Sequence, residues 1–329
     1  MNWEGRTALV TGAGGFIGSH LVETLVARGA VVRALIRYTS RHDVGNLAFL
    51  DKEVRDQVEV LTGDLRDPGA VLDAMRGCQR VFHLGALIAI PYSYVHPREV
   101  IETNVLGTVN VLEAARVVCP EHVVQISTSE VYGTARFVPI TESHPLQAQS
   151  PYAASKAAAD KIAESYAKSF AVPVTTLRPF NTFGPRQTAR AVIPTIIMQV
   201  LHRRHVDLGA LATTRDFTYV TDTANGMVMA GETEYHRLGE MNLGTDSEIC
   251  IGDLAARIMS IIGREVPIRE DVRRLRPADS EVERLWASNS LARDRIGWTP
   301  VVSLDEGLVK TIQWVSDHPH LYRPTHYEV

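Results

Sequence analysis

The sequence TALVTGAGGFIG, at residues 7–18, decides the fold that we expect for this chain. Thr7–Val10 are typical of a short buried strand, and a helix is predicted from about Phe16 to Arg28, ending at Gly29. Glycines between a strand and a helix let the backbone approach a pyrophosphate, whose charge meets the helix N-terminus. An ordinary glycine-rich turn is the alternative, and the strand–turn–helix context disfavours it. The residues predicted to bind a dinucleotide here are Gly12, Gly15, Phe16, Ile17 and Gly18.

The residues that follow the second predicted strand, Val31–Ile36, bear on the choice of cofactor. An acidic residue there binds the ribose 2′-hydroxyl of NAD, whereas a basic one accommodates the 2′-phosphate of NADP. This chain has Arg37, Ser40 and Arg41, and guanidinium groups bind phosphate through charge-assisted hydrogen bonds. We therefore predict NADP, with Arg37 and Ser40 at the 2′-phosphate. NAD remains possible, and a solvated loop is the alternative for these side chains.

Strands and helices continue to alternate up to about residue 180. Strands are predicted at Val58–Thr62, Val81–Leu84, His122–Ile126 and Val174–Arg178, with a helix after Pro68 and a long amphipathic helix at Arg98–Val118. This order implies a parallel sheet with helices on both faces, a Rossmann-type doubly wound α/β fold. His83 lies inside an apolar strand and is interpreted as a core residue. Four further cofactor-binding residues are predicted at loops after strands: Asp64 and Leu65 near the adenine, and Leu84 and Ala86 beneath the cofactor.

The pattern becomes less regular after residue 180. Helices are predicted near Ile193–Arg203, Thr221–Glu232, Ile251–Ile262 and Leu304–Trp314, with short strands such as Met241–Leu243 between them. We expect a dinucleotide-binding domain at residues 1–180 and a smaller C-terminal α/β lobe at residues 181–329. The lobe is expected to interleave with the last strands of the sheet.

Residues 127–156 carry the chemistry that the sequence predicts. The run STSEVYG, at 127–133, follows a strand, and in open α/β sheets ligands bind at the carboxyl ends of the strands. The run SPYAASK, at 150–156, opens a helix with Ser150 as its N-cap. Tyr152 and Lys156 are four residues apart and share one helix face. An ammonium beside a phenol favours the phenolate, which gives a base that works near neutral pH.

The overall composition excludes several classes of protein. The chain has 329 residues, 45% of them hydrophobic, and a net charge of -4, which gives no electrostatic footprint for nucleic acid. No apolar run approaches the roughly 20 residues of a membrane-spanning helix, and the N-terminus lacks the regions of a signal peptide. The three cysteines lack the spacing of metal ligands. We expect a cytoplasmic protein without a metal, nucleic-acid or membrane partner.

Taken together, the glycine loop, Asp64-Leu65, Thr128 and the Tyr152/Lys156 pair resemble an extended short-chain dehydrogenase/reductase that acts on nucleotide sugars. The resemblance implies that Tyr152 is the base on a sugar hydroxyl, that Thr128 bonds the same oxygen, and that Lys156 holds Tyr152 and the nicotinamide ribose. It also implies a homodimer, in which helix 98–118 and the Tyr152 helix pair with their copies as a four-helix bundle. The C-terminal lobe is expected to grip the diphosphate of the nucleotide sugar through Asn181, Arg186, Arg215 and Arg276.

Within this family the tripeptide Thr128-Ser129-Glu130 discriminates between activities. Simple 4-epimerases usually lack the acid, whereas 4,6-dehydratases need a carboxylate to take the C5 proton. GDP-mannose 4,6-dehydratases carry the same Thr-Ser-Glu, while many other hexose dehydratases carry Asp-Glu, so the group that protonates the departing C6 hydroxyl is left open. The wider sequence is most similar to bacterial dehydratases of NDP-N-acetylglucosamine.

The expected function is thus an NDP-hexose 4,6-dehydratase with Glu130 as the second catalytic base. UDP-glucuronate decarboxylases also carry Thr-Ser-Glu, and their Asn-Thr-Phe-Gly-Pro-Arg segment is similar to residues 181–186. They and the 4-epimerases are the alternatives within the family. A non-catalytic NADP-binding sensor or scaffold is the alternative outside enzymes. Thr128, Glu130, Tyr152 and Lys156 argue against it, because a sensor needs neither a base nor a second carboxylate.

Overall fold

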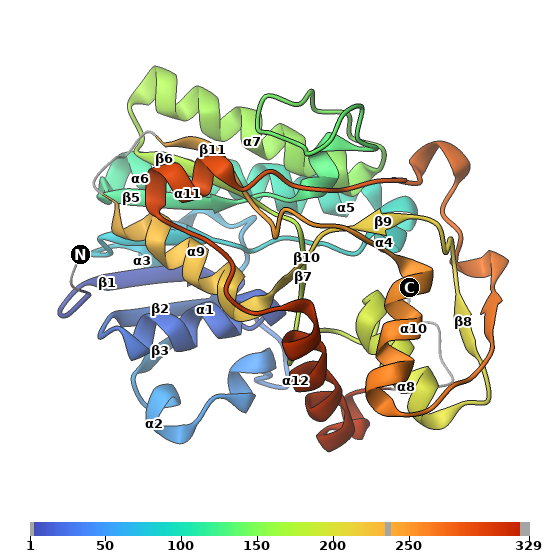
Figure 1. The fold of residues 1–329 in the computed structure, drawn as a ribbon. Helices are drawn as coiled ribbons and strands as arrows, with labels where there is room; N and C mark the ends of the chain where they lie inside the picture. Colours follow the sequence, from blue (N-terminus) through green and yellow to red (C-terminus); the bar gives the residue numbers. More distant parts are fainter. Residues whose placement is uncertain (1–2, 234–237, 323–329) are drawn as a thin grey trace.

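A seven-stranded parallel sheet forms the centre of the molecule (Figure 1). The computed structural model describes residues 3–233 and 238–322. The strand order is β11-β6-β5-β4-β1-β2-β3, with every pair parallel. The order reverses beside β1, which is the topological switch point where such sheets bind ligands. The strands are β1 (Thr7–Thr11), β2 (Val31–Ile36), β3 (Val58–Thr62), β4 (Arg80–His83), β5 (His122–Ile126), β6 (Val174–Pro179) and β11 (Gly239–Leu243).

Helices cover both faces of this sheet, as the alternating sequence predicts. On one face α3, α6 and α7 pack around a buried cluster that includes Leu9, Val81 and Val123. On the other face α1 and α9 pack around Val10, Val124 and Leu177. Neighbouring strand residues therefore point to opposite cores, which explains why the strands are nearly continuous apolar runs. The helices are α1 (Phe16–Ala27), α3 (Pro68–Met75), α6 (Gly107–Val118), α7 (Pro151–Phe170) and α9 (Val220–Glu232).

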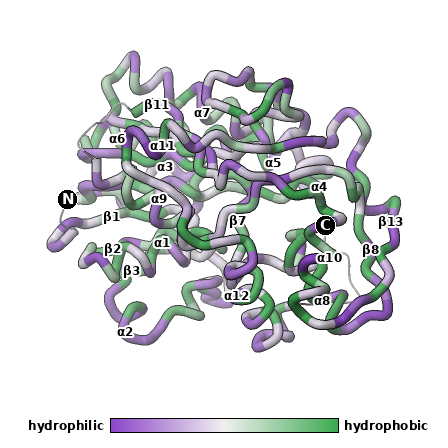
Figure 2. Tube along the Cα trace, viewed as in Figure 1, coloured by the Kyte–Doolittle hydropathy of each residue, from purple (hydrophilic) through white to green (hydrophobic). Residues whose placement is uncertain are grey.

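A second, smaller lobe lies beside the carboxyl ends of the strands. Buried hydrophobic residues of α8, α10 and α12 form the core of this lobe. Hydrophobic residues recur along these helices (Figure 2). Three two-stranded sheets accompany the helices: β7–β10, β9–β12 and β8–β13. The elements are β7 (Asn181–Phe183), α8 (Val192–His202), β8 (Val206–Leu208), β9 (Thr214–Arg215), β10 (Phe217–Tyr219), β12 (Ile249–Cys250), α10 (Ile251–Ile262), β13 (Ile268–Glu270), α11 (Ser290–Ile296) and α12 (Leu304–Asp317).

The chain returns to the central sheet after it has entered this lobe. Helix α9 packs on α1, and β11 pairs with β6 at the edge of the sheet. Residues 220–232 and 239–243 therefore lie with the sheet. The smaller lobe is made of the segments that precede α9 and follow β11.

One helix differs from its predicted form. The single helix expected at Arg98–Val118 is interrupted: α5 (Pro97–Ile101) and α6 are joined by a π-helical segment, Glu102–Leu106. The stretch Ala89–Pro97 contains the short helix α4 (Ile90–Val95). The remaining short helix, α2 (Lys52–Arg55), follows β2. Among the described residues, no helix is long and apolar enough to cross a membrane.

Candidate active site

The glycine-rich loop lies against the turn that follows β4. Gly12 has a φ of +69°, and a Cβ atom on it would stand 2.8 Å from the Cα of Gly85. A Cβ atom on Gly18 would stand 2.3 Å from the carbonyl oxygen of Gly12. Larger side chains would therefore push the loop away from α1 and from the turn at 84–86. The predicted cofactor residues of these two loops, Leu84 and Ala86 included, share one end of the sheet.

The segment after β2 is arranged so that its basic side chains are exposed. Arg37, Ser40 and Arg41 are all exposed. Further along this segment, the backbone N–H of Asn46 donates to the carbonyl of Gly14 in the glycine-rich loop at 2.9 Å. Asp64, which was predicted to meet the adenine, is ion-paired with Arg66 (Nη2–Oδ2 2.6 Å). Hydrogen bonds from Arg66 lower the pKa of Asp64. The carbonyl of the next residue, Leu65, accepts from Asn110 of α6 at 2.8 Å.

Tyr152 and Lys156 lie buried in the first turns of α7. Ser150 caps this helix, since its hydroxyl accepts from the N–H of Ala153 at 3.1 Å. Burial raises the pKa of Tyr152, whereas a hydrogen bond with Thr128 lowers it. Lys156 Nζ donates to the carbonyl of Ile126 at 2.5 Å, and burial lowers the pKa of Lys156 to about 8. Burial of Tyr152 thus opposes the phenolate, and its role as a base stays a prediction.

Glu130 lies beside two of the arginines that were predicted to bind substrate. Thr128 begins a 3₁₀ turn over Ser129–Tyr132, and its hydroxyl accepts from the N–H of Glu130 at 3.3 Å. Glu130 is 8% exposed, and its Oε2 is 3.5 Å from Nη1 of Arg276. Arg276 and Arg215 both approach the carboxylate of Glu281, at 4.0 and 3.5 Å. The fold thus gathers these charged groups from segments far apart in sequence.

The other two predicted substrate residues have different surroundings. Asn181 is half-buried at the start of β7, and its Oδ1 is buried without a hydrogen-bond partner, so this atom is available to a ligand. Arg186 instead forms an ion pair with Glu23 of α1 (Nη2–Oε2 3.0 Å) and approaches the hydroxyl of Ser19. Arg186 therefore joins the β7 loop to α1, and a role in binding diphosphate stays a prediction.

A buried cluster of charged side chains near Lys156 was not predicted from the sequence. Asp160 lies on α7, and its Oδ2 accepts from Nε of Arg178 at 3.0 Å. The negative charge of Asp160 raises the pKa of Lys156 and so opposes the effect of burial. Arg178 also donates to the hydroxyl of Tyr132 at 3.0 Å. Asp160 follows Lys156 by four residues, so the helix period could have drawn attention to it.

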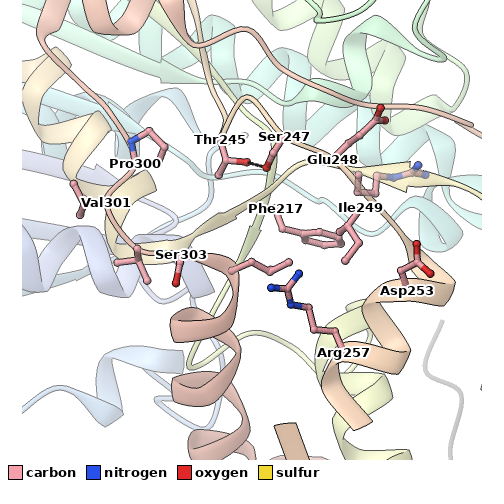
Figure 3. Close-up of a pocket in the computed structure, with 13 residues that line it drawn as sticks. Phe217, Thr245, Ser247, Glu248, Ile249, Asp253, Arg257, Pro300, Val301 and Ser303 are labelled. Carbon is pink, nitrogen blue, oxygen red and sulfur yellow. Dashed lines mark hydrogen bonds between the residues drawn. The ribbon is translucent and has the colours of Figure 1, made fainter. Parts of the chain in front are cut away.

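The smaller lobe contains a cavity of about 660 Å³ between the N-terminal ends of α10 and α12 (Figure 3). Phe217 and Ile249 line its centre, and Arg257 and Asp253 of α10 line one wall. Of the predicted site residues its lining includes Arg215, so the cavity adjoins the arginine cluster rather than the Tyr152 centre. Within the described part of the chain, no group of three or more His, Cys, Asp or Glu side chains is arranged to hold a metal ion.

Sequence comparison relates the chain to known proteins. The sequence pattern of the GDP-mannose 4,6-dehydratase family matches residues 9–311. A dTDP-glucose 4,6-dehydratase of Streptomyces griseus is 33% identical over 96% of this chain and 96% of its own length. A putative UDP-glucose 4-epimerase of Methanocaldococcus jannaschii is 30% identical over 94% of this chain and 98% of its own length. The sequence is thus similar both to dehydratases and to epimerases.

A solved structure shares the whole arrangement. The dTDP-glucose 4,6-dehydratase DesIV of Streptomyces venezuelae, solved with bound NAD, superimposes with a TM-score of 0.86 and 29% identity. The match covers 97% of this chain and 99% of that one. The likeness therefore extends over the sheet and the smaller lobe together.

Proposed function

The chain belongs to the extended short-chain dehydrogenase/reductase family of nucleotide-sugar dehydratases and epimerases, which is NAD-dependent, and we propose that it is a nucleotide-sugar 4,6-dehydratase. The observation that carries this proposal is the buried carboxylate of Glu130, two residues after Thr128 and within reach of Arg276. An epimerase only removes and returns hydride at C4, and needs no such acid. Elimination of water across C5 and C6 requires a base at C5.

In the proposed first step Tyr152 takes the proton of the C4 hydroxyl. Thr128 donates to the same oxygen, and the Lys156 ammonium stabilises the phenolate form of Tyr152, which becomes a neutral phenol when it takes the proton. When bound, NAD(P)⁺ accepts the hydride from C4 and later returns it to C6. Because burial raises the pKa of Tyr152, we infer that nearby positive charge, such as the Lys156 ammonium, is needed to make the phenol a base.

In the proposed second step the C4 ketone acidifies the C5 proton, and Glu130 removes it. The C6 hydroxyl leaves as water, and the returning hydride and a proton at C5 complete a 4-keto-6-deoxy sugar. The cofactor ends as it began, and the sugar has lost one water. The diphosphate would bind Arg215 and Arg276, because guanidiniums form paired bonds to phosphate oxygens. Asn181 Oδ1 would accept from a hydroxyl or N–H of the nucleotide sugar.

We propose an NDP-N-acetylglucosamine or a related NDP-hexose as the substrate. The test is mass spectrometry of the purified protein with UDP-, GDP-, CDP- and dTDP-sugars. We expect loss of one water from a neutral hexose without net consumption of reduced cofactor. Interconversion of C4 epimers without loss of water would favour a 4-epimerase. Turnover of UDP-glucuronate with release of CO₂, and of no neutral sugar, would favour a decarboxylase, and no turnover of any sugar would favour a sensor.

NADP is proposed as the preferred cofactor, although the related DesIV structure holds NAD. An Arg37→Asp variant should lose preference for NADP over NAD by about 10-fold or more, because it places a carboxylate where the 2′-phosphate would lie. Cofactor dissociation constants of both proteins measure this. Arg293→Asp, an equivalent change at an exposed site on α11, is the control. Release of NAD but no NADP from the denatured native protein would contradict the proposal.

A homodimer is also proposed, formed through the face that carries α5, α6 and α7. Leu106 and Val117 are 52% and 70% exposed, and Phe170 at the end of α7 is exposed too. Such apolar side chains on neighbouring helices favour symmetric pairing with a second copy. We expect a dimeric mass by light scattering at micromolar concentration, and a monomeric mass after Leu106→Glu. A monomeric native protein would disprove this proposal.

The activity is expected to decline as the pH rises through the pKa of Lys156, which burial lowers to about 8. Only the protonated ammonium stabilises a phenolate, so kcat should fall on the alkaline side of this value. The carboxylate of Asp160 raises the pKa of Lys156, and an Asp160→Asn variant should therefore shift the decline to lower pH. A kcat profile of both proteins between pH 6 and 10 measures this. An unchanged profile in the variant would contradict the role given to Lys156.

A further inference from the structure

The side chain of Gln149 joins three segments of the chain beside the proposed site. Gln149 directly precedes Ser150, the N-cap of α7. Its Nε2 donates to the carbonyl of Asp279 at 3.1 Å and to the carbonyl of Glu281 at 3.0 Å. Its Oε1 accepts from the backbone N–H of Thr134 at 2.5 Å. An N–H only donates and a carbonyl only accepts, so these three partners fix the orientation of the amide.

A further bond runs between the same two segments in the opposite direction. The hydroxyl of Ser280 donates to the backbone carbonyl of Gln149. A hydroxyl has a single proton, so the phenol of Tyr94, whose oxygen lies 2.6 Å from Oγ of Ser280, donates to Ser280. Tyr94 belongs to α4, and Ser280 is only 9% exposed. Three segments far apart in sequence therefore meet at this buried hydroxyl.

These bonds end close to the arginine that lies beside Glu130. Ser280 ends a short 3₁₀ turn, and the carbonyl of Pro277 accepts from the N–H of Ser280 at 2.8 Å and from that of Glu281 at 3.1 Å. Arg276 directly precedes Pro277, and its Nη1 is 3.5 Å from Oε2 of Glu130. The turn that Gln149 holds thus has Arg276 on one side and Glu281 on the other.

We propose that Gln149 is a positioning residue, which holds Arg276 in place relative to Tyr152 and so sets where the diphosphate lies relative to the base. The inference rests on the proposed function, in which Arg276 binds the diphosphate and Tyr152 acts on the C4 hydroxyl. Binding energy from a remote part of a substrate can be used to orient its reacting centre. A displacement of about 1 Å at that centre can cost on the order of 10²-fold in rate.

The test compares Gln149→Leu with a matched control, Gln79→Leu. Gln79 is also half-buried and also bridges backbone groups: its Oε1 accepts from the N–H of Thr7 at 2.8 Å, and its Nε2 donates to the carbonyl of Gly77 at 3.0 Å. It directly precedes β4, at the amino ends of the strands and so opposite the proposed site. Both side chains become leucine, which is similar in size and makes no hydrogen bond.

Binding of nucleoside diphosphates gives a readout that needs no turnover. UDP, GDP, CDP and dTDP are titrated into each protein, and the tightest of them is used for the comparison. In Gln149→Leu we expect its dissociation constant to rise by about 10-fold, because Arg276 must then be ordered on binding. We expect kcat to fall by about 10- to 100-fold in the same variant. Gln79→Leu should keep both values.

A double-mutant cycle separates positioning of Arg276 from a general loss of structure. If Gln149 acts through Arg276, the double variant Gln149→Leu/Arg276→Met should bind the diphosphate no more weakly than Arg276→Met alone. Losses of affinity that add up would overturn this inference alone. Native affinity in Arg276→Met would instead overturn the proposed role of Arg276 together with the inference.

Hydrogen exchange measures the same bonds directly. In Gln149→Leu the amides of Thr134, Ser280 and Glu281 should exchange with solvent about 10-fold faster, and those of β1 should not, since local opening follows lost contacts. If Gln149→Leu does not fold, Ser280→Ala removes one bond between the same segments and carries the test, with smaller changes in the same direction. Unchanged exchange at these amides would overturn the inference.

Discussion

A Glu130→Gln enzyme is expected to oxidise its sugar at C4 and then to stop. The amide cannot take the C5 proton, so elimination should slow by about 10²–10⁴-fold, the range that general bases contribute. Hydride then stays on the cofactor, and the protein should accumulate reduced cofactor together with a 4-keto-hexose that has lost no water. Absorbance of the reduced nicotinamide and mass spectrometry of the quenched mixture measure the two products.

The neighbouring Glu281→Gln change is a matched control for this result. Glu281 approaches Arg215 and Arg276, and Glu130 approaches Arg276, so both variants place an amide of the same size beside Arg276. The Glu281→Gln enzyme is expected to complete the catalytic cycle and to release dehydrated product. Any effect of the change should be confined to the KM for the sugar. If Glu130→Gln releases dehydrated product at the native rate, the carboxylate is not the base at C5. The dehydratase proposal would then lose its main support.

A Tyr152→Phe enzyme is expected to lose the first chemical step. Without the phenolic oxygen nothing at this position can accept the C4 proton, and turnover should fall by about 10²–10⁴-fold. Neither reduced cofactor nor ketone should accumulate, which distinguishes this variant from Glu130→Gln. Nucleotide-sugar binding should persist, because the change leaves Arg215 and Arg276 in place. Single-turnover absorbance and equilibrium binding measure both outcomes.

Tyr132→Phe removes a buried phenol of the same size without touching the proposed base. Its hydroxyl donates to Oδ1 of Asn242 at 2.7 Å and accepts from Arg178. Loss of these bonds should lower the free energy of unfolding by about 1–3 kcal/mol, the usual effect of leaving buried partners unpaired. Turnover of the folded protein should remain near the native value. Near-native turnover of Tyr152→Phe, in contrast, would refute the assignment of the base.

The sequence by itself determined the features that depend on near neighbours in the chain. The strand, the glycine turn and the first helix follow from a few consecutive residues, because a side chain would not fit the close approaches at positions 12 and 18. The pairing of Tyr152 with Lys156 on one helix face follows from the helical period. The family was therefore recognisable, and the parallel sheet with helices on both faces is confirmed.

Tertiary structure decided the features that depend on groups distant in sequence. No local pattern indicates that Arg186 pairs with Glu23, or that Arg276 reaches Glu130, because each contact joins segments that meet only after folding. The return of residues 239–243 to the sheet is set in the same way, by burial of an apolar strand against β6. His83 was interpreted correctly as a core residue, but its hydrogen bonds to Thr11 and Thr108 needed the folded chain. The pKa values of Tyr152 and Lys156 also follow from burial, which is a property of the three-dimensional surroundings and not of the motif.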